Sequence, residues 1–114
     1  MDVTMDEFQA LVGAAMAEIP EPFSSALAEV AVVVEEHGPP EMAPLYGLYQ
    51  GVPLIHGRQP SGMPPPQISI YRRPLIEVCR SREELIEQVR ITVLHELGHH
   101  LGLDEDRLDE LGYA

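Results

Sequence analysis

The sequence has no lysine and no tryptophan, and its 114 residues include only one cysteine and two phenylalanines. The seven basic residues are therefore all arginine, and 19 acidic residues outnumber them to give a formal net charge of −12. Because binding phosphates requires a basic face, this balance excludes nucleic acid as an expected partner. The acidic charge would keep a small protein in solution, and it would also attract a cationic partner.

Cys79 is the only cysteine, so no internal disulfide can form and nothing in the sequence requires an oxidising compartment. Cys79 is a weaker candidate for a metal ligand than for an ordinary small core residue. Residues 1–7 are acidic and lack the basic region and apolar run of a signal peptide, and no apolar stretch approaches membrane-spanning length. The sequence therefore predicts a cytoplasmic protein that does not bind membranes.

The short length predicts one domain over residues 1–114 with a single, mainly aliphatic core and a shallow cleft. Helix patterns at both ends and strand patterns between them indicate an α+β fold. The sequence does not fix the oligomeric state, and a monomer is the simplest expectation.

The strongest helical pattern begins after Ser81, which forms a capping box with Glu84. Gly102 suits the left-handed position that ends a helix, and it could turn the next side chains back toward the helix. The pattern predicts a helix that packs one apolar stripe against a sheet, formed by Leu85, Ile86, Val89, Val93, Leu97 and Leu101.

His95, Glu96 and His99 lie within this predicted helix in a His-Glu-x-x-His pattern. Residues four apart face the same side of a helix, so the two imidazoles can bind one zinc ion. Glu96 is rotated about 100° from His95 and can reach a water activated by the metal, as a general base would. The pattern is typical of a zinc hydrolase, although two ordinary polar histidines on a solvated helix face would also produce it.

From His95 to Glu105 the chain reads His-Glu-x-x-His-x-x-Gly-x-x-acid, and it resembles the small bacterial zincin-like proteins described as possible zinc metallopeptidases. The resemblance implies a minimal zincin fold with a small mixed sheet of about three to four strands packed on the motif helix and an N-terminal helix. It also implies that His95 and His99 are ligands, that Glu96 is catalytic, and that the acid after the glycine turn is the third ligand. The resemblance to this family extends over nearly the whole chain and includes residues 6–12, 19–23, 29–36, 48–53, 106–108 and 111–112.

The chain departs from the family pattern at Glu105, where aspartate is usual. Glu105 is the first choice for the third ligand, with Asp104 and Asp106 as the alternatives. The glycine turn also resembles that of the metzincins, but those enzymes need a methionine downstream and none follows Met63. A true metzincin is therefore not expected.

The remaining patterns predict an N-terminal helix capped by Thr4 and ending before Pro20, and a short helix over residues 22–29. The β-branched residues 30–35 predict a strand at the centre of the sheet, and residues 45–49 a second strand. Residues 67–71 alternate in polarity and predict an edge strand to which an extended peptide could add. Alternatively, Arg72, Arg73 and Pro74 protect that edge from aggregation.

A proline- and glycine-rich loop at residues 57–66 could form a lid over the site or be plain surface. His56 at its start is expected to be a surface residue rather than a fourth ligand. His100 is expected to point away from the metal, because it is rotated about 100° from His99.

The expected reaction is hydrolysis of an amide bond in a peptide or protein substrate, with Glu96 taking a proton from water and giving it to the leaving amine. Tyr71, Arg72 and Tyr113 are all candidates to stabilise the oxyanion. The alternative is a non-catalytic, zinc-stabilised module whose acidic surface binds a partner protein. The presence of Glu96 favours the enzyme, because a structural zinc site needs a fourth protein ligand but no base. A peptidase that cleaves one particular regulatory protein is a third hypothesis.

Overall fold

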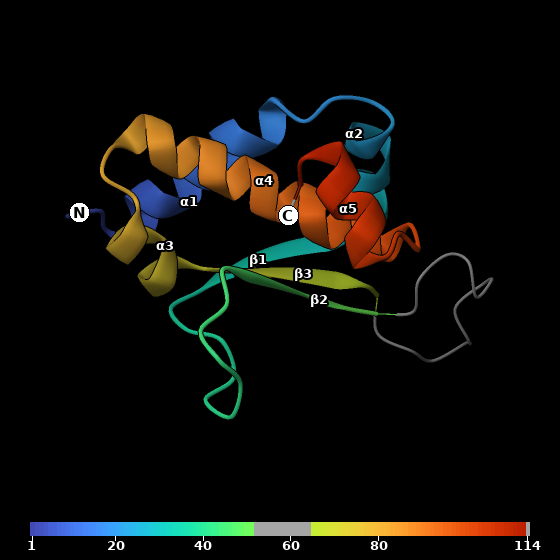
Figure 1. The fold of residues 1–114 in the computed structure, drawn as a ribbon. Helices are drawn as coiled ribbons and strands as arrows, with labels where there is room; N and C mark the ends of the chain where they lie inside the picture. The colour runs from blue at the N-terminus through green and yellow to red at the C-terminus, as the bar shows by residue number, and fades with distance from the viewer. Residues whose placement is uncertain (52–64, 114) are drawn as a thin grey trace.

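The computed structural model describes residues 1–51 and 65–113, which form helices and one small sheet (Figure 1). The predicted α-helices near the N-terminus and over the motif are both present, and so are the three predicted strands. In chain order the elements are α1 (Met5–Ala17), α2 (Phe23–Ala26), the 3₁₀ helix η1 (Leu27–Glu29), β1 (Ala31–Glu35), β2 (Gly47–Gln50), β3 (Gln67–Tyr71), α3 (Arg72–Val78), α4 (Arg82–His100) and α5 (Glu105–Leu111).

The sheet within the described residues has three strands in the order β1-β3-β2. β1 pairs with β3 in parallel, with Val33 opposite Ser69, whereas β2 pairs with β3 antiparallel, with Leu48 opposite Ser69. The sheet is therefore mixed, and the predicted α+β class with a small mixed sheet of about three strands is confirmed.

The predicted positions of two strands in the sheet are wrong. The sequence pattern puts residues 30–35 at the centre, but β1 lies at one edge and is only partly buried. The pattern puts residues 67–71 at an edge, but β3 is the central strand and its last four residues are buried. The edge beside the motif helix is instead β2, which contacts α4.

The polar residues of β3 misled the prediction because both faces of this strand are covered. The Ser69 hydroxyl accepts a hydrogen bond of 3.2 Å from the Gln67 side chain, so its burial leaves no unpaired group. The ring of Tyr71 lies under Gly38, where an added Cβ would come within 3.0 Å of the ring carbon Cε2. The segment that follows β1 therefore covers the end of β3 at Tyr71.

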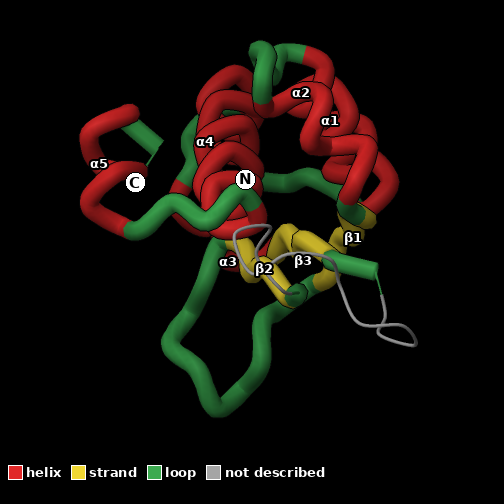
Figure 2. The backbone as a smooth tube through the Cα atoms, turned by 90° about the vertical axis from the view of Figure 1, so that its right-hand side faces the viewer, coloured by secondary structure: helices red, strands yellow, loops and turns green. Residues whose placement is uncertain are grey.

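Helices α1 and α4 pack against each other, and α4 also contacts β2 and β3 (Figures 1 and 2). The predicted stripe of α4 faces this core, with Leu85, Val89, Val93 and Leu97 fully buried and Ile86 and Leu101 packed beside them. Burying a leucine or valine side chain contributes about 1.5–3 kcal/mol, so this stripe fixes α4 on the sheet. The motif residues at the end of α4 are held by the same packing.

The predicted N-caps Thr4 and Ser81 are present at the starts of α1 and α4. The hydroxyl of Thr4 accepts from the Glu7 N–H at 3.2 Å, and the hydroxyl of Ser81 accepts from the Glu84 N–H at 3.0 Å. The Glu84 carboxylate accepts from the backbone N–H of Arg80, one residue before the cap, at 3.1 Å. Each cap satisfies backbone groups that a helix start leaves unpaired.

The sequence patterns do not predict two of the short helices. Pro74 lies within the first turn of α3, where a proline removes no internal helix hydrogen bond, so it does not stop the chain from becoming helical after β3. The acids that follow Gly102 begin α5, whose N-cap is Asp104. The sequence indicates these acids only as possible metal ligands, but in the structure they also form the start of α5.

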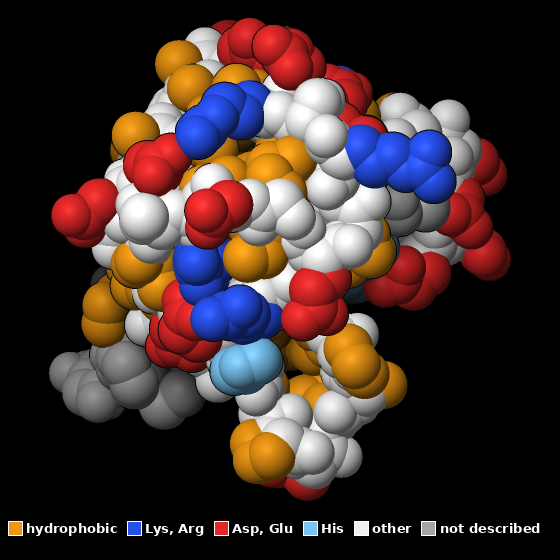
Figure 3. Space-filling view, turned by 90° about the vertical axis from the view of Figure 1, so that its left-hand side faces the viewer, with side chains coloured by type: hydrophobic (Ala, Val, Ile, Leu, Met, Phe, Trp, Pro, Cys, Tyr) orange, Lys and Arg blue, Asp and Glu red, His pale blue; other side chains and the backbone are white. Residues whose placement is uncertain are grey.

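Arginine and acidic side chains lie next to one another on the face shown in Figure 3. The ion pairs of arginine in the described parts of the chain are Arg72 and Arg73 with Glu36, Arg82 with Glu7, Arg90 with Glu87, and Arg107 with Glu110. Among the described helices, none combines the length and the apolar character needed to cross a membrane.

Candidate metal centre

The last turns of α4 bring the three motif residues together. One ligand atom from each of His95, Glu96 and His99 can be chosen so that all of them lie within 4.8 Å of one another. The Nε2 atoms of the two histidines are 3.2 Å apart, and both rings are partly exposed. The i,i+4 spacing therefore aims both imidazoles at one point on the surface.

Helix α5 brings a carboxylate to the same point. Oε1 of Glu105 lies 3.0 Å from Nε2 of His99 and 3.4 Å from Nε2 of His95. Asp104 has a different task, because its carboxylate accepts from the Arg107 N–H at 2.9 Å and caps α5. Of these two neighbouring acids, the structure therefore brings Glu105 to the histidines and commits Asp104 to the helix start.

The C-terminal end of α5 contacts His95 from its other side. Gly112 has a φ of +83°, a conformation that favours glycine, and the reversal that it allows is closed by a bond of 2.9 Å from the Tyr113 N–H to the Leu108 carbonyl. The Tyr113 carbonyl then lies 2.7 Å from Nδ1 of His95. A carbonyl can only accept, so Nδ1 carries the proton and, in the neutral ring, Nε2 presents a lone pair to the site.

The donor set fits a zinc ion. Two ligands at 2.0–2.1 Å from a tetrahedral ion lie about 3.3 Å apart. The separations among the two Nε2 atoms and Oε1 of Glu105 are 3.0, 3.2 and 3.4 Å. The backbone carbonyl behind His95 is also the kind of outer contact that orients metal-binding histidines.

The approach of α5 to α4 depends on Gly98, which lies between the two histidines. A Cβ added at Gly98 would come within 2.3 Å of Cδ2 of Leu108, and Leu108 is fully buried. A side chain can occupy that space only if Leu108 turns within the core or α5 moves. The glycine therefore lets α5 lie close to α4, where Glu105 meets the two histidines.

Replacement of Gly98 by alanine should destabilise the protein by about 1–3 kcal/mol through overpacking, and it should weaken metal binding because Glu105 is displaced. Gly13 provides a matched control in α1, since nothing lies within 4 Å of a Cβ added there. Gly13→Ala should stabilise the protein by about 0.5–1 kcal/mol. Urea unfolding of both variants measures these changes, and equal stabilisation would contradict the close contact with Leu108.

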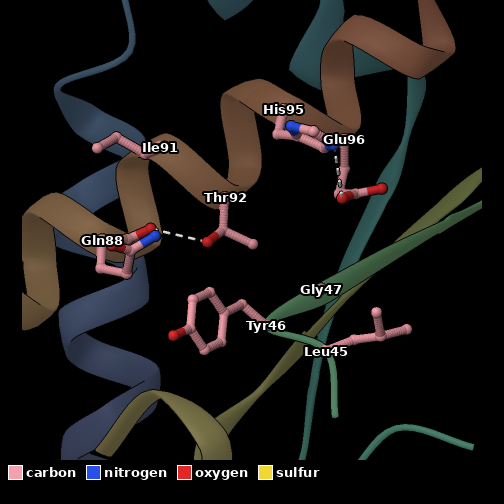
Figure 4. Close-up of a pocket in the computed structure, with 8 residues that line it drawn as sticks. All are labelled: Leu45, Tyr46, Gly47, Gln88, Ile91, Thr92, His95 and Glu96. Atoms are coloured by element: carbon pink, nitrogen blue, oxygen red, sulfur yellow. Dashed lines mark hydrogen bonds and ion pairs between the residues drawn. The ribbon is translucent and has the colours of Figure 1, made fainter. Parts of the chain in front are cut away.

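Glu96 lies on the side of α4 that faces the sheet and is only 8% exposed. Burial raises the pKa of its carboxyl, while the imidazoles of His95 and His99 and a hydrogen bond from the backbone N–H of Tyr49 in β2 oppose the rise. The carboxylate lies 4.0 Å from Nε2 of His95 (Figure 4). A buried carboxylate with a raised pKa is a stronger base than an exposed one.

A cavity of about 230 Å³ adjoins Glu96 and His95 (Figure 4). Its other walls come from α4 and from the start of β2, and they are Leu45, Tyr46, Gly47, Gln88, Ile91 and Thr92. No motif in the sequence marks these residues as part of a site. For the three wall residues in α4, helical spacing could have indicated the site. Positions 88, 91 and 92 lie seven, four and three residues before His95 and therefore share its side of the helix.

Gly47 is the glycine in the wall of this cavity. A Cβ added there would lie 2.7 Å from Cγ2 of Thr92 and 3.0 Å from the Ser69 carbonyl oxygen. The hydroxyl of Thr92 donates to the Gln88 carbonyl at 2.8 Å, which leaves its methyl group toward β2. A glycine is therefore needed for β2 to lie this close to the motif helix.

Of the three candidates for oxyanion stabilisation, Arg72 and Tyr113 have side chains that contact other residues. The guanidinium of Arg72 donates to both carboxylate oxygens of Glu36 and to the Val3 carbonyl. The ring of Tyr113 packs edge-on against Phe23 with centroids 5.6 Å apart. Tyr71 is buried, and this burial raises the pKa of its phenol, as does the charge of Glu96.

His100 is buried on the side of α4 away from His99 and bonds Tyr49 and Glu29, as its rotation around the helix predicts. Cys79 is a buried thiol whose pKa is raised by burial, in keeping with a core residue. His56 and most of the predicted loop lid lie outside the described residues.

The sequence model of the zincin-like metallopeptidase family matches residues 27–113, and the chain belongs to this family. Among solved structures it is similar to a conserved hypothetical protein from Thermo thermophilus, with a TM-score of 0.58 and 28% identity. That match covers 87% of this chain and 94% of the other. No curated protein matches the chain. The family resemblance in the sequence is thereby confirmed.

Proposed function

We propose that this protein is a zinc-dependent peptidase in which His95, His99 and Glu105 hold the metal and Glu96 is the general base. The convergence of the two Nε2 atoms and the Glu105 carboxylate within 3.0–3.4 Å is the observation that carries the proposal. Membership of a metallopeptidase family supports the reaction class. Three ligands from the protein leave a coordination position for water or substrate, as catalytic zinc sites require.

When bound, zinc acts as a Lewis acid that polarises the scissile carbonyl and lowers the pKa of water. Glu96 accepts a proton from the attacking water and later gives it to the leaving amine nitrogen. The burial that raises the pKa of Glu96 favours both transfers, because the carboxyl binds and releases the proton nearer neutral pH. The Tyr113 carbonyl holds His95 in the tautomer that keeps Nε2 free for the metal.

The substrate that we propose is an extended peptide paired with the outer edge of β2. The Tyr71 N–H donates to the Tyr46 carbonyl at 2.9 Å, so position 46 faces β3. Hydrogen bonding alternates along an antiparallel strand, so the N–H and C=O of Gly47 face outward. An added strand could bond these groups and run past Glu96 and the two histidines.

The cavity beside Glu96 favours an uncharged apolar side chain next to the scissile bond. Leu45, Ile91 and the Thr92 methyl supply apolar walls, and Glu96 is the only acidic lining residue in the described cavity. A volume of about 230 Å³ is below the roughly 300 Å³ of the smallest drug-sized pockets and suits a single side chain.

The proposal is tested by measuring the metal content of the purified protein together with cleavage of a diverse peptide pool, with and without a chelator. We expect about one zinc per chain, cleavage next to apolar residues, and loss of cleavage on chelation that added zinc restores. Zinc binding without any cleavage would instead favour the non-catalytic, zinc-stabilised interaction module. Absence of bound zinc would contradict both functions.

A further inference from the structure

A second pair of polar residues, Glu96 and His100, lies on α4 beside the histidines that face the proposed metal. Glu96 and His100 are four residues apart, so they share one side of the helix, and both are buried against the sheet. His100 is 2% exposed, yet both of its ring nitrogens have hydrogen-bond partners. A buried imidazole held at both nitrogens is a fixed structural element, and the proposed reaction does not use it directly.

The partners of His100 define a directed chain of hydrogen bonds. Nε2 of His100 lies 3.0 Å from Oε1 of Glu29 in η1, and a carboxylate can only accept, so Nε2 is the donor. In the neutral ring Nδ1 is then an acceptor, and the Tyr49 hydroxyl at 2.8 Å donates to it. The chain therefore runs from Tyr49 through His100 to Glu29 and joins β2 to the segment before β1.

Tyr49 is bound to the same side of α4 at two points. Its hydroxyl donates to His100, and its backbone N–H donates to the Glu96 carboxylate. Its ring also lies against the His100 ring, with centroids 5.5 Å apart. Holding the Tyr49 ring against His100 therefore also restrains the backbone whose N–H holds Glu96.

We infer that Tyr49 is a positioning residue for Glu96 and that Glu29 and His100 fix Tyr49 in place. The inference depends on the proposed function for its catalytic consequence. Because β2 is an edge strand of the described sheet, only β3 pairs with it there, and the Tyr49 side chain adds a further constraint through α4 and η1. The carboxylate orientation is then set by a strand that is itself anchored.

The same contact limits where a peptide can pair. The backbone N–H and C=O of Tyr49 point away from β3, as those of Gly47 do two positions earlier. The Tyr49 N–H, however, already donates to the Glu96 carboxylate. An added strand can therefore use the N–H and C=O of Gly47 but not the N–H of Tyr49. The substrate register is restricted to the part of β2 that borders the apolar cavity.

The test uses variants at Tyr49 and Glu29, since the wholly buried His100 could not be changed without a risk of unfolding. In zinc-loaded protein, Tyr49→Phe and Glu29→Leu should lower kcat about tenfold with little change in KM, because the base is misplaced and the substrate edge remains. Glu29→Gln should restore most of kcat, because its amide oxygen still accepts from His100. Glu35→Gln, an exposed change at the end of β1 and on the far side of the sheet from β2, is the control.

A second measurement separates this inference from the proposed peptidase function. The backbone amide signal of Tyr49 in ¹H–¹⁵N spectra should shift in Glu29→Leu and return toward its original position in Glu29→Gln. If no peptide is cleaved but the signal follows this pattern, the peptidase proposal fails and the positioning contact stands. An unshifted amide signal, or cleavage with equal kcat in Tyr49→Phe and wild type, would overturn the inference.

Discussion

Replacement of Glu96 by glutamine should leave one zinc per chain and slow peptide hydrolysis by about 10²–10⁴-fold, the usual contribution of a general base. The amide has nearly the same shape and can still accept from the Tyr49 N–H, so the fold around it should persist. It cannot take a proton from water. Metal analysis and the initial rate on one cleaved peptide measure the two effects.

Glu87→Gln is the matched control for this variant. Glu87 lies on the same helix more than two turns earlier, is exposed, and bonds Arg90 at 2.6 Å and 3.0 Å. Its loss should leave the rate unchanged. Equal rates for Glu96→Gln and wild type would refute the catalytic role of Glu96, whereas loss of zinc from Glu96→Gln would indicate that this residue is a ligand.

Replacement of His99 by alanine should lower zinc affinity by more than about 100-fold. Loss of a residue that only contacts a metal ligand already costs up to about 100-fold, and loss of a ligand should cost more. The variant keeps only two of the three donors that converge at the site. In wild type, free zinc at 100 times Kd should stabilise the fold by about 2.7 kcal/mol. The variant should show no such gain when thermal unfolding is followed with and without zinc.

Three further variants make the ligand assignment specific. His37→Ala changes a histidine beyond β1 and should retain zinc binding. Glu105→Gln should weaken binding, whereas Asp106→Asn should not, because the carboxylate that approaches the two histidines belongs to Glu105. Weaker binding only in Asp106→Asn would assign the third ligand to the other acid.

The motif helix could be predicted from sequence because everything that defines it is local. Ser81 caps its start, the stripe through Val89 and Val93 sets its buried side, and Gly102 follows its end with a φ of +85°. The i,i+4 geometry then fixes the two histidines relative to each other without any knowledge of the fold. The fold class followed from the same local patterns.

The strand order could not be predicted because it depends on contacts between distant segments. β1 has the more apolar sequence, yet β3 occupies the centre because chain on both faces covers it, including the segment at Gly38 that lies over Tyr71. Polarity along one strand does not reveal that second cover. The sequence pattern therefore assigns the peptide-binding edge to residues 67–71 instead of to β2.

The region after Gly102 was only partly predictable for a different reason. An acidic residue can cap a helix or bind a metal, and sequence alone does not distinguish the roles of Asp104 and Glu105. The cavity beside Glu96 likewise has walls from two distant segments, Gly47 in β2 and Ile91 in α4. Such surfaces form only when the tertiary structure is complete.

Helix α5 contacts the histidine pair at both of its ends, through Glu105 at the first turn and the Tyr113 carbonyl after the last. The number of residues between His99 and Gly112 is therefore as important as their identity. One residue inserted within α5 would turn the end of the helix by about 100° relative to its start, so Glu105 and the Tyr113 carbonyl could no longer both face the histidines. Engineered variants of this protein should leave that spacing untouched.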